Sequence, residues 1–186
     1  MSSLSARSPQ TVRQTTWWTL AVAGLITAAL TLPLAPVNSA WWRVADTANG
    51  NFNDEIGYRE LVETVVKIRD ALPAQQSARL GILAGDVGEA GAVNLCGPAC
   101  GLPRAISGMN SYWLRGYGDP PPETVIVAGK DRNFVNENFA SCDLVGHLTN
   151  QYEIVNNAID GYADVLLCRH LRQPWPNFWK YFQHYG

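Results

Sequence analysis

The distribution of apolar residues divides the chain into two parts. Residues 17–34, WWTLAVAGLITAALTLPL, form one apolar block, and no charged residue lies between Arg13 and Arg43. From residue 58 onward, short apolar runs alternate with amphipathic segments and with turns rich in Gly and Pro. This pattern predicts one apolar helix followed by a folded domain.

Helices and strands are expected to alternate in the folded domain. In residues 60–72, Leu61, Val65, Ile68 and Leu72 recur at helical spacing, and Pro73 follows them. The apolar runs at residues 80–84 and 123–129 predict buried strands. We therefore expect a small α/β sandwich with a mostly parallel sheet of about four strands. The other expected elements are helices at 87–95, 130–140 and 174–185 and strands at 141–148 and 161–170.

The apolar block is long enough to predict a transmembrane helix. Eighteen helical residues span about 27 Å, and the pairs Trp17-Trp18 and Trp41-Trp42 flank the block as interfacial anchors do. Arg7 and Arg13 precede the block, which predicts a cytoplasmic amino terminus. The expected organisation is a disordered cytoplasmic tail at 1–13, a transmembrane helix at 14–42, a linker at 43–57 and an extramembrane domain at 58–186.

A cleaved signal peptide is the alternative, with Val37-Asn38-Ser39 as its cleavage site. Both interpretations export residues 43–186. The predicted location is the inner (plasma) membrane, crossed once, with the carboxyl-terminal domain in the periplasm or outside the cell and membrane lipid as a partner.

Export favours disulfides for the four cysteines. Cys96 and Cys100 enclose three residues and are expected to close a local loop, and Cys142 and Cys168 are expected to join neighbouring strands. A zinc site is the alternative, although a C-x3-C pair followed by two isolated cysteines matches no common zinc-binding pattern. We therefore expect no metal.

Charge and motifs exclude several functions. All 16 acidic residues follow Trp42, so the domain lacks the basic surface that nucleic acid requires. Gly85, Gly88 and Gly91 are spaced G-x-x-G-x-x-G, which is not the dinucleotide fingerprint and is explained by close packing of a helix on the sheet. The sequence contains no recognisable catalytic constellation, so we assign no catalytic residue and expect no cofactor.

Five residues are candidates for ligand binding. Glu89 lies in the first turn of a predicted helix, where the helix dipole explains a carboxylate, yet it is also placed to face the crevice beyond the strand ends. Asn110, Ser111, Tyr112 and Trp113 offer amide, hydroxyl and aromatic groups suited to sugars. An ordered loop whose aromatic residues cover the sheet edge is the alternative.

Several motifs in order resemble a known family. They are GYRELV from Gly57, GEAGAVNLCGP from Gly88, GLPRAISGMNSYWLRG from Gly101, ETVIVAG from Glu123 and the pair Cys168-Arg169. Together they resemble the carboxyl-terminal extramembrane domain of bacterial membrane glycosyltransferases related to protein mannosyltransferases and aminoarabinose transferases. Two positions depart from the pattern, with Met109 where the family often has His and Arg115 where it often has Trp.

The resemblance implies sugar transfer from a polyprenyl-phosphate donor by a multi-helix membrane portion that these 186 residues lack. The chain is then expected to be an accessory part or fragment that is not catalytic alone. Its expected partners are a polyprenyl-linked sugar or glycan and a separate glycosyltransferase membrane subunit, and no nucleic acid. The alternative is an exported, membrane-anchored module that binds a glycan or a protein through residues 110–113.

Overall fold

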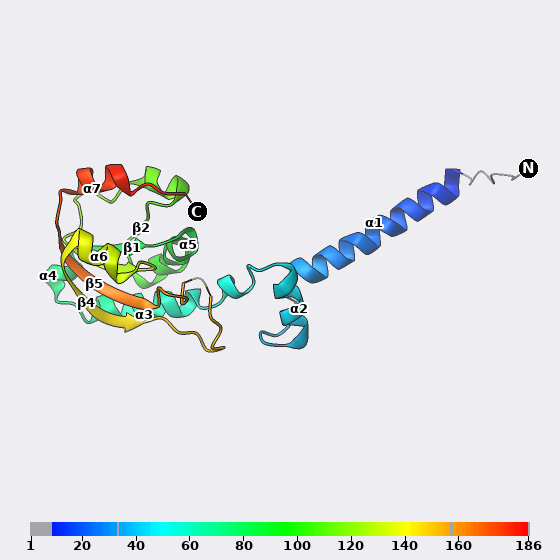
Figure 1. The fold of residues 1–186 in the computed structure, drawn as a ribbon, viewed down its shortest axis with the longest axis horizontal. Helices are drawn as coiled ribbons and strands as arrows, with labels where there is room; N and C mark the ends of the chain where they lie inside the picture. Colours follow the sequence, from blue (N-terminus) through cyan, green and yellow to red (C-terminus); the bar gives the residue numbers. More distant parts are fainter. Residues whose placement is uncertain (1–8, 33, 157, 186) are drawn as a thin grey trace, which may run out of the picture. The chain divides into compact units, whose positions relative to one another are not determined.

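The computed structural model describes residues 9–32, 34–156 and 158–185, which form two compact units, 1–52 and 53–186. The first unit contains α1 (Pro9–Thr31) and α2 (Ala40–Ala48). Figure 1 shows the order of the elements along the chain. In the second unit they are η1 (Asn53–Glu55), α3 (Tyr58–Asp70), α4 (Ala74–Ser77), β1 (Leu80–Ala84), α5 (Val87–Cys96), η2 (Gly97–Cys100), β2 (Ala105–Ile106), η3 (Asn110–Arg115), β3 (Thr124–Ala128), α6 (Arg132–Asn138), β4 (Phe139–His147), β5 (Asp164–Leu171) and α7 (Trp175–Phe182).

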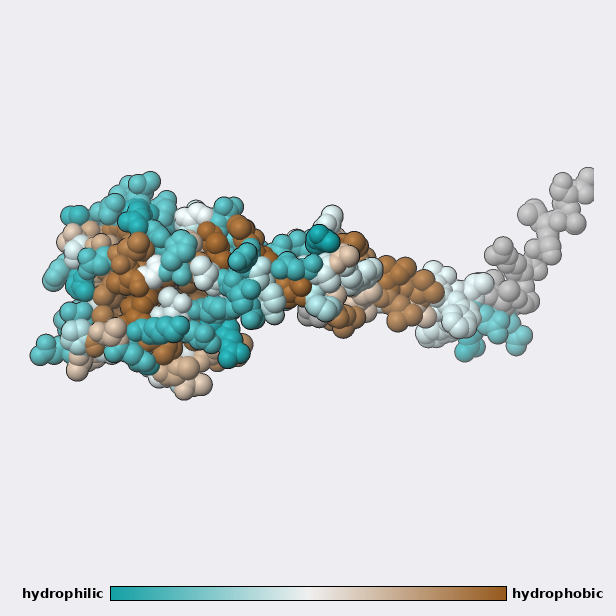
Figure 2. Space-filling view, turned by 90° about the horizontal axis from the view of Figure 1, so that it is seen from below, coloured by the Kyte–Doolittle hydropathy of each residue, from teal (hydrophilic) through white to brown (hydrophobic). Residues whose placement is uncertain are grey.

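Helix α1 (Pro9–Thr31) contains most of the apolar block, but the expectation that it crosses a membrane is not supported. No helix in the described part of the chain is both long and apolar enough to span a bilayer. The helix begins with PQTVRQTT, so its apolar portion starts only at Trp17 and ends at Thr31. Those 15 residues extend about 22 Å, short of a hydrocarbon core of about 30 Å. Figure 2 shows the hydrophilic surface at the end of α1 that adjoins the grey residues.

The first unit also departs from the expected organisation. Helix α1 begins at Pro9, inside the segment expected to be disordered, and residues 1–8 lie outside the described residues. Helix α2 occupies part of the expected linker, and the Ser39 side chain caps it by accepting a hydrogen bond from the Trp42 N–H at 3.1 Å. The buried Trp42 ring packs on Phe52 with centroids 5.2 Å apart.

The second unit is a mixed α/β domain with a five-stranded sheet in the order β2-β1-β3-β5-β4. Strands β2, β1 and β3 are parallel, and β5 is antiparallel to both of its neighbours. Four strands therefore run in one direction and β5 in the other. The expected α/β class is confirmed. The sheet has one strand more than expected, because two-residue β2 is too short to leave a periodic pattern in the sequence.

Helices cover both faces of the sheet, because its central strands are apolar on both sides. All residues of β1 and β3 are buried, which is typical of strands between two helical layers. Ile82 and Ile126 pack with α3 and α5 on one face, whereas Leu83 and Val127 pack with α6 and α7 on the other. Figure 1 shows α3 and α7 on opposite sides of the strands.

Candidate functional site

The chain leaves the adjacent strands β1 and β3 toward opposite faces of the sheet. β1 leads into α5, which belongs to one hydrophobic cluster, and β3 leads into α6, which belongs to the other. β2 and β3 flank β1 on its two sides. This arrangement is a topological switch point, and the crevice outside the carboxyl ends of such strands is where α/β proteins bind ligands.

Two glycines bring the strand ends together at this point. Gly85 follows β1 and donates its N–H to the Ala128 carbonyl at 2.9 Å. A methyl group added to the Cα of Gly85 would overlap the Gly129 carbonyl, so position 85 has no room for a side chain. Gly129 itself has a φ of +71°, which favours glycine. The turns that follow β1 and β3 are therefore in close contact through their backbones.

The first turn of α5 places two carboxylates at the crevice. The Asp86 side chain accepts a hydrogen bond from the Glu89 N–H at 2.9 Å, and the Glu89 carboxylate accepts from the Gly85 N–H at 2.7 Å and the Asp86 N–H at 3.3 Å. These reciprocal hydrogen bonds form a capping box, in which Asp86 is the N-cap residue immediately before α5. It fixes the Glu89 side chain back toward the strand end.

The Glu89 carboxyl group has an unusually high affinity for a proton. Its side chain is buried, and burial together with the negative charge of Asp86 raises the pKa of Glu89 to about 7. The two backbone N–H groups and Lys130 oppose this rise without cancelling it. A carboxyl that titrates near neutral pH in a crevice is a recognised sign of a functional site.

Lys130 and His184 form the opposite wall. Lys130 follows Gly129, and its Nζ lies 3.4 Å from His184 Nε2. His184 Nδ1 lies 2.9 Å from the Phe182 carbonyl oxygen, which only accepts, so Nδ1 donates in that contact. Nε2 faces both the Lys130 ammonium and the Gly85 carbonyl oxygen, each at 3.4 Å. Burial lowers the pKa of Lys130, although the charges of Glu89 and Asp86 oppose that change. The carboxyl-terminal segment is held there because His184 exchanges backbone hydrogen bonds with Gly108 and Asn110.

The crevice has a volume of about 450 Å³, and most of the residues that line it have polar or charged side chains. Asp160 and Tyr162, both exposed, complete it from the segment before β5, and Met109 contributes a thioether. Carboxylates, an ammonium, an imidazole and a phenol together supply both donors and acceptors of hydrogen bonds. In the described part of the chain, no three His, Cys, Asp or Glu side chains are grouped as metal ligands.

The candidate residues from the sequence separate into different environments. Glu89 lines the crevice, whereas Asn110 and Ser111 are exposed in η3. Tyr112 packs against the α3–α5 cluster, with the Arg115 guanidinium 4.3 Å from its ring centroid. Trp113 is half-buried beneath α7. The four residues of this loop therefore do not form one continuous binding surface with Glu89.

Sequence reasoning missed most of the crevice. Asp86 lies two residues after one predicted strand and Lys130 directly after the other, so the strand-end rule predicts both as site residues. The other four candidates, residues 110–113, lie outside the crevice. His184, Asp160 and Tyr162 carry no comparable signal, because only the tertiary fold brings them to the strand ends.

The cysteines follow the expectation in part. Cys142 and Cys168 face each other in the register of β4 and β5 and form a disulfide. Cys96 and Cys100 are free and exposed, so the expected bond between them is not formed in the structure. Cys96 ends α5 and Cys100 ends η2, and these helical turns continue without a cross-link.

Comparison of the chain with protein-family models, with characterised proteins and with solved structures gives no match. The resemblance to membrane glycosyltransferases therefore depends on the sequence motifs and stays a prediction.

Proposed function

We propose that residues 53–186 form an exported sugar-binding domain, the accessory part of a polyprenyl-phosphate-sugar-dependent membrane glycosyltransferase that is not catalytic alone. The observation that carries this proposal is the polar crevice at the switch point, with Glu89, Lys130, Tyr162 and His184 along its walls. The motif resemblance supports the link to glycosyltransferases. A separate membrane subunit would supply the reacting groups.

The charges of the crevice favour a neutral, polyhydroxylated ligand. The crevice is lined by three carboxyl groups, those of Asp86, Glu89 and Asp160, and by one ammonium group, that of Lys130. A phosphate group would therefore meet more negative than positive charge. Sugar hydroxyls both donate and accept, and can therefore bond to carboxylates, ammonium and phenol alike. The volume of about 450 Å³ suits one or two sugar rings rather than a long chain.

The Cys142–Cys168 disulfide supports the proposal that the domain acts outside the cytoplasm. Disulfides persist in oxidising compartments and are rare in the cytosol. Contact with membrane lipid is proposed for α1, whose large apolar side chains such as Trp18 and Leu25 are exposed.

A stand-alone exported binding module is the second candidate, for glycans or for a protein. The crevice favours it because every residue that lines the cavity comes from the second unit. On this alternative, binding requires no lipid-linked donor and no membrane subunit.

Titration of the full chain in detergent with free sugars and with a polyprenyl-linked sugar tests both candidates. An accessory role predicts saturable binding of the lipid-linked sugar as well as of the free sugar, without turnover. A stand-alone module predicts binding of the free sugar alone. Tyr162→Phe should weaken either interaction, whereas Tyr181→Phe, on an exposed face of α7, should not. Absence of saturable binding would refute sugar binding, and turnover by the chain alone would refute the accessory role.

A further inference from the structure

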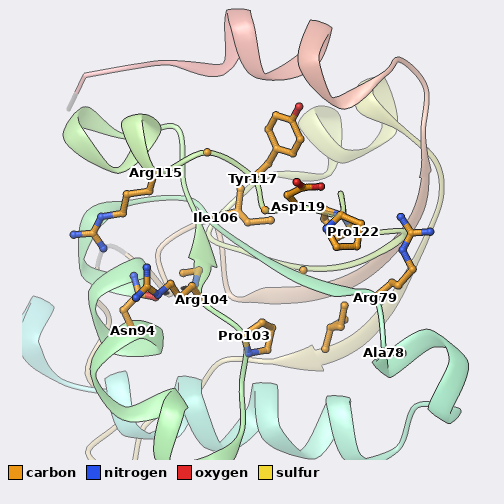
Figure 3. A pocket seen from close by; sticks show the side chains of 16 residues that line it. Ala78, Arg79, Asn94, Pro103, Arg104, Ile106, Arg115, Tyr117, Asp119 and Pro122 are labelled. Atoms are coloured by element: carbon orange, nitrogen blue, oxygen red, sulfur yellow. Dashed lines mark hydrogen bonds between the residues drawn. The ribbon is translucent and has the colours of Figure 1, made fainter.

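A second cavity lies at the other end of β1, separate from the crevice. It has a volume of about 390 Å³ and is bounded by the start of β1, by β2 and by the loop at residues 115–120. It shares no lining residue with the crevice. Figure 3 shows Arg104, Arg115 and Asn94 gathered at one end of this cavity and Arg79 at the opposite end.

Two residues that line this cavity each carry a buried N–H donor without a partner among the described residues. The donors are the Asn94 side-chain Nδ2 and Arg79 Nε. The other atom of the Asn94 amide is used, because Oδ1 accepts from the Ala105 N–H at 2.9 Å. That bond fixes the orientation of the amide, and an unpaired buried donor is costly unless a ligand supplies an acceptor.

Arg104 and Arg115 add two positive charges beside Asn94. Neither guanidinium forms an ion pair with a carboxylate in the described ranges, whereas Arg79 pairs with Glu123. Arg115 is held in place by its position over the Tyr112 ring. Guanidinium groups bind oxyanions through paired N–H groups, and two of them match a doubly charged anion better than a carboxylate.

We propose that this cavity binds a phosphomonoester through Arg104, Arg115 and the Asn94 side-chain amide. The cavity is larger than a phosphate group, so phosphate is the terminal group of a larger molecule. Tyr117, Ile106 and Pro122 form the wall beyond the charged end, where the organic part would pack. Asp119 lies near Tyr117 in Figure 3 and confines an anion to the end that holds Arg104 and Arg115.

Calorimetric titration of the full chain with phenyl phosphate tests the proposal. We expect one saturable site that binds phenyl phosphate more tightly than benzoate or inorganic phosphate. Binding should strengthen from pH 5 to pH 8, as the ester gains its second charge. The ionisable side chains that line the cavity are Arg79, Arg104, Arg115, Tyr117 and Asp119. Inorganic sulfate, doubly charged at both pH values, controls for changes in the protein itself.

Three variants distinguish this site from non-specific attraction. Arg104→Gln and Asn94→Asp should each weaken phenyl phosphate binding by about tenfold or more. Asn94→Asp keeps the acceptor for the Ala105 N–H and so retains the local fold. Arg59→Gln removes an exposed charge from α3 and should leave binding unchanged. Equal effects of all three variants, benzoate binding as tight as that of phenyl phosphate, or no saturable binding would overturn the proposal. Sugar binding at the crevice would be unaffected by that result.

Discussion

Gly129 lies against the Glu89 carboxylate so closely that a methyl group on its Cα would overlap the acid. The contact joins the end of β3 to the first turn of α5, and it leaves the carboxylate room only between the two strand ends. Because Gly129 also has a positive φ, both the local conformation and the packing select glycine at this position.

Replacement of Gly129 by alanine should therefore destabilise the domain by about 3 kcal/mol, through backbone strain and overlap with Glu89. Gly161 is the matched control, because its φ is +84° but no atom lies within 4 Å of an added methyl. Gly161→Ala should cost only about 1 kcal/mol. Chemical denaturation of both variants measures the difference. Equal losses would show that the contact with Glu89 contributes nothing.

The raised pKa of Glu89 makes the stability of the domain depend on pH. The folded state holds the proton up to about pH 7, whereas an exposed Glu releases it near 4.5. This stabilisation is present in full below pH 4.5 and is lost as the pH rises through 7, by about 3 kcal/mol in total. Denaturation between pH 4.5 and 8 measures the slope.

Glu89→Gln serves as the control for that slope, since the amide oxygen still accepts from the Gly85 N–H. The variant should lose the Glu89 part of the decline and exceed the natural chain in stability at pH 8. An identical pH profile in both proteins would contradict the assignment of the slope to Glu89.

The fold of the domain followed from local patterns where those patterns were strong. The helix around Val65 and the strands around Ile82 and Ile126 are continuous apolar or amphipathic segments, so their types were predictable. The two-residue β2 and the antiparallel direction of β5 depend on tertiary pairing, which no local period encodes.

The crevice was only partly predictable for the same reason. Glu89 was found because a carboxylate in a first helical turn is visible in sequence. His184 could not be placed at the crevice from local sequence, because it lies 54 residues from Lys130, its neighbour there. In the apolar block, the Trp pairs suggested membrane anchors, but the polar first turns of α1 leave too short an apolar length.

Trp113 should act in folding rather than in ligand binding. Its indole N–H donates to the Trp179 carbonyl at 2.8 Å, and the Trp179 indole donates back to the Trp113 carbonyl at 3.2 Å. The rings stack with an interplanar angle of 4°. Trp113→Ala should lower stability by about 3 kcal/mol. Leu114→Ala, in the same turn but 76% exposed, should change it by less than about 0.5 kcal/mol. A stable Trp113→Ala variant that had lost sugar binding would show the opposite role.

The Cys142–Cys168 bond should dominate the contribution of the cysteines to stability. The bond joins the edge strand β4 to β5 and closes a sequence separation of 26 residues. Removing it in Cys142→Ala/Cys168→Ala should lower the free energy of unfolding by about 3 kcal/mol. The exposed pair gives the control, because Cys96→Ser/Cys100→Ser removes thiols that form no bond in the structure and should be nearly neutral. Thiol titration of the unfolded chain should detect two free thiols before reduction and four after it. Four thiols before reduction would contradict the cross-strand bond, and none would show that Cys96 and Cys100 are also oxidised.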